Sequence, residues 1–276
     1  MNTTENRDNS IKHKTLLDIL LELLGKQQSD AARAKALDAI EAYEEHEADS
    51  THALRPRLDA RPLTPQWHVP LIVGHTARAG GAFSSALQSY EYDYWKKVAN
   101  LMLERNNVGN TTLSVHLRDN GTRRAYDEAR LSVKHAGQHI PFIMELHFNA
   151  SVDKFANGIE TLAIATNPVT CGIASAMSHS FQQSTGNKLR HGNGVKRLFT
   201  GDRGYVNLTY AGDKPAVLVE PFFGSNTSDV SNGRWTSIKS AAQHLERAII
   251  HGIVAVTEPV SAANFVQYVE TPLRAE

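Results

Sequence analysis

Short apolar runs that alternate with segments of helical spacing dominate the chain from residue 67 onward. Five segments have the continuous or alternating apolar pattern of buried strands: 69–73, 112–117, 139–146, 158–165 and 216–219. Apolar residues at helical spacing lie between them, for example at Trp95, Val98 and Met102, and again in 174–183 and 238–253. Strands that alternate with helices predict an α/β fold, with a mostly parallel twisted sheet flanked by helices.

The N-terminal part of the chain has a different pattern. A leucine-dense stretch ends at Gly25, and Ala36, Leu37, Ile40 and Tyr43 form an apolar stripe at helical spacing. We therefore expect a helical hairpin over residues 1–48, a linker rich in Pro, Arg and Thr over 49–66, and the main domain over 67–276. Two helices cannot bury these stripes alone, so the hairpin is expected to dock on the main domain or to form a homodimer.

Composition excludes several classes of function. Lys plus Arg and Asp plus Glu both count 29, and this balance argues against nucleic-acid binding and against recruitment to anionic membranes. Apolar runs stay far below the ~20 residues of a membrane span, and the polar N-terminus lacks the apolar core of a signal peptide. We therefore expect synthesis in the cytoplasm without stable membrane insertion. Cys171 is the only cysteine, so a transition-metal site must use His, Asp and Glu.

Three predicted strands lead directly into residues that can work on a metal: His75, His147 and Glu220. Each residue alone is compatible with a structural role, but the ends of parallel strands meet at one rim, so the three together indicate a site. Catalytic zinc usually takes His nitrogens and a carboxylate and keeps one position open. The start of the next helix offers Glu91 or Asp93 as the third ligand. Either carboxylate could instead stabilise the helix N-terminus through a favourable interaction with the helix dipole.

Several blocks of the chain resemble a known family. LIVGHTARAGGAFS, SYEYDYWKKVA, ELHFNAS, GIETL and PAVLVEPFFGSN occur in this order. They are similar to blocks of the zinc-dependent N-acetylmuramoyl-L-alanine amidases whose α/β catalytic domain is related to zinc carboxypeptidases. The resemblance covers approximately 69–256. The chain departs from the family pattern at three places. Thr-Ala-Arg follows His75, Trp95 occupies a position where asparagine is common, and Asn-Gly-Val-Lys replaces Arg-Gly-Val-Lys at 193–196.

The resemblance implies roles for individual residues. Position by position, the resemblance implies that His75, Glu91 and His147 are the ligands of Zn²⁺. It therefore favours Glu91 over Asp93 as the third ligand. It also implies that Glu220 is the catalytic general base. Beyond these, three polar residues are candidates for orienting the ligands or contacting the peptide or sugar of the substrate: Asn149, Glu160 and Arg203. For Glu160 and Arg203 a surface or salt-bridge role is the alternative.

The implied activity is hydrolysis of the amide between N-acetylmuramic acid and L-alanine in peptidoglycan. Without a signal peptide, such an enzyme fits a phage endolysin of a Gram-negative host, which reaches the cell wall in the periplasm after holin-type release. A bacterial autolysin would normally carry a secretion signal. Two alternatives stay open: a related zinc peptidase or amidohydrolase acting on another amide, and a catalytically silent module that binds the cell wall. The presence of Glu220 argues against the silent module.

Overall fold

A single six-stranded sheet organises the part of the chain that the structure describes. This computed structural model describes residues 66–106, 108–133 and 137–257, so the expected hairpin (1–48) and nearly all of the linker (49–66) lie outside the described residues. The order of the strands across the sheet is β4 (Thr111–Leu117), β1 (Trp67–Val73), β5 (Ile143–Leu146), β8 (Ala216–Glu220), β6 (Glu160–Ile164) and β7 (Val195–Leu198).

The direction of the strands confirms a mostly parallel sheet. Strands β4, β1, β5 and β8 all run parallel, whereas β6 pairs antiparallel with β8, and β7 runs parallel to β6. The reversal brings the beginning of β6 to the edge where β1, β5 and β8 end, and Glu160 pairs with Glu220 there. One rim of the sheet therefore collects the ends of β4, β1, β5 and β8 and the starts of β6 and β7.

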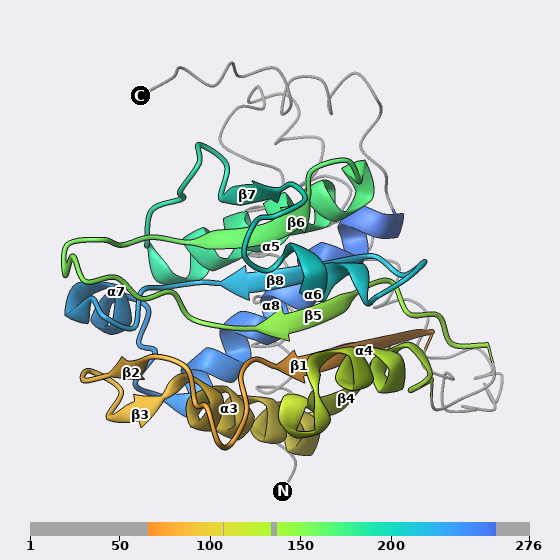
Figure 1. Cartoon of the computed structure of the whole chain (residues 1–276), viewed down its shortest axis with the longest axis horizontal. Coiled ribbons are helices and arrows are strands. Elements are labelled where there is room, and N and C mark those ends of the chain that lie inside the picture. Colours follow the sequence, from red (N-terminus) through yellow and green to blue (C-terminus); the bar gives the residue numbers. More distant parts are fainter. Residues whose placement is uncertain (1–65, 107, 134–136, 258–276) are drawn as a thin grey trace, which may run out of the picture. The chain divides into compact units, whose positions relative to one another are not determined.

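Helices cover both faces of the sheet, which gives three layers. Figure 1 shows α5 and α8 behind the sheet and α4 and α6 in front of it. The helices are α3 (Glu91–Arg105), α4 (Thr122–Arg130), α5 (Pro168–Thr185), α6 (Tyr205–Thr209), α7 (Thr227–Asn232) and α8 (Ile238–Thr257), with the 3₁₀ turn η2 (Arg118–Asn120). A small hairpin of β2 (Phe83–Ser84) and β3 (Ser89–Tyr90) precedes α3.

The alternation of side chains along the strands produces two apolar cores. In β1, Leu71 and Val73 belong to the core shared with α3, α5 and α8, whereas Ile72 belongs to the core shared with α4 and α6. Successive side chains of a strand point to opposite faces, so a strand covered on both sides is apolar throughout. This is why the apolar run predicted β1 correctly. None of the described helices is both long and apolar enough to span a membrane.

The predicted strand at 139–146 is shorter than expected. Only Ile143–Leu146 is strand, and His139 makes an isolated parallel bridge to Trp67. Pro141 lies between the two segments and has no N–H to donate to a ladder. In contrast, the predicted helix at 174–183 extends over the whole of α5. Asn167 caps α5 by accepting a hydrogen bond from the backbone N–H of Thr170, and Pro168 occupies its first turn.

Candidate metal centre

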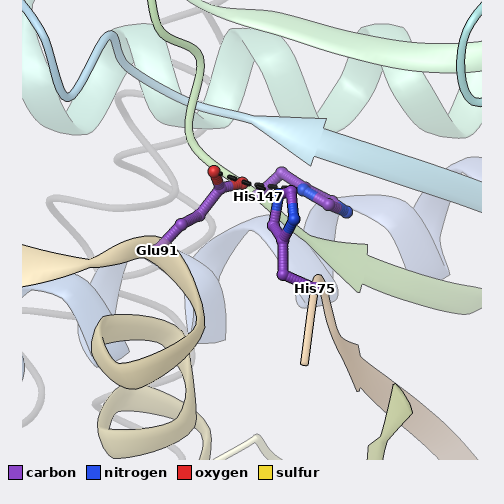
Figure 2. A group of neighbouring side chains, drawn as sticks. All are labelled: His75, Glu91 and His147. Carbon is purple, nitrogen blue, oxygen red and sulfur yellow. Dashed lines mark hydrogen bonds and ion pairs between the residues drawn. The ribbon is translucent and has the colours of Figure 1, made fainter. Parts of the chain in front are cut away.

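Neighbouring strand ends and one helix start bring two imidazoles and a carboxylate together. Val73 of β1 pairs with Leu146 of β5, so His75 and His147, which follow these strands closely, lie side by side. Glu91 is the first residue of α3, and the hairpin before it turns the chain back over the rim. The backbone N–H of Glu91 donates to the carbonyl of Ala82 at 3.1 Å, which fixes this return. Figure 2 shows the three side chains converging from these elements.

The distances between these side chains suit a shared metal ion. Nδ1 of His147 lies 2.7 Å from Oε1 of Glu91, and Nε2 of His75 lies 3.2 Å from Oε2 of the same carboxylate. One possible ligand atom from each residue lies within 4.8 Å of the other two. Asp93, the alternative third ligand, is exposed and does not belong to this cluster. Two imidazole nitrogens and a carboxylate oxygen are a donor set typical of catalytic zinc sites.

Two glycines leave the room that these rings need. A Cβ on Gly74 would overlap the ring of His147, and a Cβ on Gly81 would lie 2.6 Å from Cδ2 of His75 and 2.8 Å from Oε2 of Glu91. His75 itself adopts a left-handed backbone conformation with φ of 64°, which is uncommon for a residue with a side chain. Such conformations concentrate at functional sites, where the surrounding structure enforces them.

Charge is concentrated at this centre. Burial lowers the pKa of His147, but hydrogen bonds to Glu145 and Glu91 outweigh it and raise the pKa to about 10. For Glu91, burial acts to raise the pKa, yet the hydrogen bonds and charges of His147 and His75 bring it down to about 2. Without a metal, therefore, His147 is an imidazolium whose two N–H groups are held by carboxylates.

A second pair of carboxylates lies at the same rim. The amide nitrogen of Asn149 donates to Oε1 of Glu160 at 2.6 Å and to Oε2 of Glu220 at 3.0 Å. Burial, followed by the hydrogen bond and the charge of Glu160, raises the pKa of Glu220 to about 8. Glu160 has the opposite balance: burial raises its pKa, but hydrogen bonds to His191 and Glu220 and the nearby cations lower it to about 2. The two neighbouring carboxylates thus differ strongly in their affinity for protons.

Three cationic or ionisable side chains surround Glu160. Nε of Arg190 and Nε2 of His191 each lie 2.8 Å from Oε2 of Glu160, and Nζ of Lys196 lies 3.7 Å from Oε1. Glu160 itself is buried, whereas 33–42% of each of the three partner side chains is exposed. We call Arg190, His191 and Lys196 the basic rim. Arg190 and Lys196 offer positive charge to solvent next to the Glu160–Glu220 pair.

The structure brings six of the seven predicted site residues to one rim. His75, Glu91, His147, Asn149, Glu160 and Glu220 all lie there. Arg203 does not join them. Strand β7 runs away from this rim, and Arg203 lies in the exposed turn between β7 and α6.

Sequence reasoning did not identify the buried Glu145, whose carboxylate contacts His147, or the basic rim residues Arg190 and His191. Glu145 stands inside an apolar run, where a charged residue in a buried strand was the available signal.

Comparisons with known proteins agree with this architecture. Residues 69–255 match the family described as N-acetylmuramoyl-L-alanine amidase. A search of curated proteins found no match. The crystal structure of N-acetylmuramoyl-L-alanine amidase from Clostridium difficile 630 superposes with a TM-score of 0.55 at 16% identity, covering 70% of this chain and 98% of that one. This likeness supports the fold.

Two further solved structures have similar coverage. One is the catalytic domain of CwlV, an N-acetylmuramoyl-L-alanine amidase from Bacillus (Paenibacillus) polymyxa var. colistinus, with a TM-score of 0.49, 18% identity, and 69% and 98% of the two chains covered. The other is the catalytic domain of the CD27L endolysin targeting Clostridia difficile, with a TM-score of 0.48, 19% identity, and 68% and 96% covered. Because the family match spans most of the sequence and the fold agrees with it, the chain belongs to the N-acetylmuramoyl-L-alanine amidase family.

Proposed function

We propose that this protein is a zinc-dependent amidase that hydrolyses the bond between N-acetylmuramic acid and L-alanine in peptidoglycan. The family match supports an amidase that acts on peptidoglycan. The observation that carries the metal dependence is the convergence of His75, Glu91 and His147, with Glu220 at the same rim. The proposal assigns the first three as zinc ligands and Glu220 as the general base.

The residues present fit a zinc ion. Three potential ligand atoms approach from separate elements, and Gly74 and Gly81 keep the space around the two imidazoles free of Cβ atoms. His75, Glu91 and His147 would hold the ion and leave further coordination positions for water and substrate. When bound, zinc supplies Lewis acidity toward the amide carbonyl and makes a water molecule more acidic.

The proposal assigns to Glu220 the transfer of the proton that hydrolysis requires. Its carboxylate would accept a proton from the attacking water and then deliver it to the nitrogen of the departing L-alanine. A general base works best when its pKa lies near the working pH, and the pKa of Glu220 is raised from its ordinary range to about 8. Asn149 donates to Glu220 and to Glu160, and so orients the base.

The basic rim suits an acidic substrate. The side chains of the basic rim, Arg190, His191 and Lys196, are partly exposed. Each of them contacts the buried carboxylate of Glu160, the neighbour of Glu220. Guanidinium and ammonium groups bind carboxylates through charge-assisted hydrogen bonds, and peptidoglycan stem peptides carry free carboxylates. We assign the rim to the peptide part of the substrate and give Glu160 an indirect part in substrate binding. For Arg203, a contact with the substrate stays a prediction from the sequence.

Purified peptidoglycan provides the test of this function. We expect the zinc-loaded protein to release peptides with new L-alanine amino termini, and Glu220→Gln to release almost none. New amino termini of another residue would instead indicate a peptidase or amidohydrolase that cuts a different amide. Cosedimentation with peptidoglycan without any release would indicate a silent wall-binding module and would contradict the proposal.

The basic rim has a separate test. Lys196→Gln is expected to raise KM for peptidoglycan several-fold at unchanged zinc content, since Lys196 contacts no proposed ligand. Lys239, an exposed lysine of α8, provides the matched control Lys239→Gln, for which we expect no change. Equal KM values for the two variants would remove Lys196 from substrate binding.

The endolysin role remains a prediction from the sequence, as does dimerisation through the N-terminal helices. We expect expression in a Gram-negative host to be harmless until a holin is co-expressed, and then to cause rapid lysis that depends on Glu220. Lysis without a holin would contradict release by a holin. The oligomeric state of the full chain, measured by light scattering, tests the homodimer.

A further inference from the structure

Glu145 is a fully buried carboxylate in the strand that leads to His147. It lies on β5 two residues before His147, so both side chains extend from the same face of the strand. Its Oε1 lies 3.0 Å from Nε2 of His147 and accepts from Nη1 of Arg118 at 2.6 Å. Oε2 accepts from the hydroxyl of Tyr126 at 2.7 Å. The amide of Asn207 lies 3.4 Å from both oxygens.

Burial of the Glu145 carboxylate is energetically unfavourable, and the fold provides hydrogen-bond donors around it. A buried carboxylate without compensation destabilises a protein by several kcal/mol. Here the compensating donors come from three separate elements, with Arg118 in η2, Tyr126 in α4 and Asn207 in α6. An apolar residue at this position of the apolar run would avoid the cost altogether. The buried charge of Glu145 therefore needs an explanation beyond the packing of β5.

The two nitrogens of His147 have different partners. Nδ1 faces Oε1 of Glu91 at 2.7 Å, inside the candidate metal centre, whereas Nε2 faces Glu145 on the other side of the ring. A neutral imidazole that keeps its proton on Nε2 presents the lone pair of Nδ1 to the metal centre. Metal-binding histidines commonly donate their second N–H to a carboxylate, which fixes the tautomer and the orientation of the ring.

We propose that Glu145 is a positioning residue for the metal centre: by accepting the Nε2–H of His147, it fixes the orientation of the ring and turns Nδ1 toward the metal. Arg118 and Tyr126 in turn hold the carboxylate of Glu145 in place. This inference rests on the proposed function, because it assumes that His147 binds zinc. It adds a residue that is neither a ligand nor the base, and that touches the site only through His147.

A purely structural role makes a different prediction. If Glu145 only neutralised Arg118, its removal would lower stability and leave metal binding unchanged. The chain contains a matched pair for this comparison: Glu246 of α8 is also buried and accepts from Nε of Arg105 at 2.9 Å. Arg105 and Glu246 lie at the end of α3 and on α8, and neither belongs to the metal cluster.

The experiment compares Glu145→Gln with Glu246→Gln in the full chain. Zinc affinity is measured by competition with a chromophoric chelator, and cobalt is substituted to read the ligand geometry from its visible absorption. We expect Glu145→Gln to weaken zinc binding about 10- to 100-fold and to change the cobalt spectrum. Glu246→Gln is expected to lose stability while keeping wild-type affinity and spectrum. Wild-type affinity and spectrum in folded Glu145→Gln would overturn the inference.

A measurement on the wild-type protein covers the case in which Glu145→Gln does not fold. Nitrogen NMR of the zinc-loaded protein should find the proton of His147 on Nε2 and the metal on Nδ1. The reverse assignment would overturn the inference, because Glu145 would then face the metal-bound nitrogen. A wild-type protein that binds no zinc would instead overturn the proposed zinc dependence, and this inference with it, so the two failures are distinguishable.

Discussion

Gly74 provides the space that the imidazole of His147 occupies. A Cβ at Gly74 would lie 2.7 Å from Nδ1 of His147 and closer still to Cε1 and Nε2. The two residues meet because β1 and β5 are neighbours, and the backbone N–H of Gly74 donates to the carbonyl of Leu146 at 3.0 Å. A glycine is therefore required at position 74 because the imidazole of His147, which follows another strand 73 positions later in the chain, occupies the space of a Cβ.

The first prediction concerns Gly74→Ala. The added methyl group must displace the His147 ring or the end of β1, since real Cβ atoms do not approach neighbours this closely. We expect zinc affinity to fall at least about 10-fold, by analogy with the loss of a residue that supports a metal ligand. Overpacking should also cost about 1–3 kcal/mol of unfolding free energy, measured on the metal-free protein by urea denaturation.

Gly172 provides the control for this substitution. It lies within α5, and a Cβ placed on it would meet no atom within 4 Å. Gly172→Ala should leave zinc affinity unchanged and should raise stability by up to about 1 kcal/mol, because alanine is the better helix former. If Gly74→Ala bound zinc as tightly as Gly172→Ala, the proposed crowding at His147 would be wrong.

The second prediction concerns His147→Ala. This variant removes a proposed ligand and leaves Glu91 and Glu145 without the imidazole that both carboxylates contact. We expect zinc content to fall to background, and the metal-free variant to lose about 3–5 kcal/mol of stability, as is usual when one partner of a buried charge pair is removed. Zinc should raise the melting temperature of the wild-type protein and not that of the variant.

His179 provides the control for this substitution, because His179→Ala removes an imidazole that is not a proposed metal ligand. It lies on α5, where its Nδ1 contacts the carbonyl of Ser175. His179→Ala should retain full zinc content and the rise in melting temperature on adding zinc. A stoichiometric zinc content in His147→Ala would contradict the ligand assignment.

The architecture of the rim was largely predictable from the sequence. The apolar runs before His75, His147 and Glu220 marked buried parallel strands, and parallel strands deliver their ends to one edge. The position of Glu91 in the cluster depended on the resemblance, because Asp93 has the same residue chemistry two positions later. Periodicity does not say how a loop of 15 residues between His75 and Glu91 folds back.

Other features could not be read from local pattern. Strand β7 is short and reads VKRL, so it lacks the apolar run that identified the other strands. The contact of Glu145 with Arg118 and Asn207 joins residues far apart in the chain, and no spacing rule predicts such a contact. The antiparallel direction of β6, which places Glu160 opposite Glu220, likewise depends on the course of the loop before it.

The third prediction concerns the catalytic effect of Glu220→Gln. The amide keeps the shape of the side chain and its contact distance to Asn149, but it cannot accept a proton from water. We expect kcat for peptidoglycan hydrolysis to fall by about 10²–10⁴-fold, the usual contribution of a general base, while zinc content stays at the wild-type level. Substantial residual kcat in the zinc-loaded variant would remove Glu220 from this role.

The last prediction uses the same substitution to test the raised pKa of Glu220 in the metal-free protein. Burial is the main cause of the rise to about 8, and the hydrogen bond and charge of Glu160 add to it. The groups that face Glu220 are Glu160, Asn149, His147 and Glu91. A carboxyl group with a raised folded-state pKa favours the folded state fully below its unfolded pKa of about 4.5, and this stabilisation is lost as pH rises toward 8.

Glu220→Gln cannot ionise, so it should escape this loss. We expect wild type and variant to have similar unfolding free energies near pH 4.5, and the variant to become the more stable protein by about 4 kcal/mol at pH 8. Carboxylates that do not contact Glu220 affect both proteins equally, so the difference between the two urea-denaturation curves reports the neighbouring pair of Glu220 and Glu160. If the difference in unfolding free energy between wild type and Glu220→Gln stayed constant from pH 5 to 8, Glu220 would already be ionised at neutral pH. The contacts of Asn149 and the basic rim would then fully compensate the charge of Glu160.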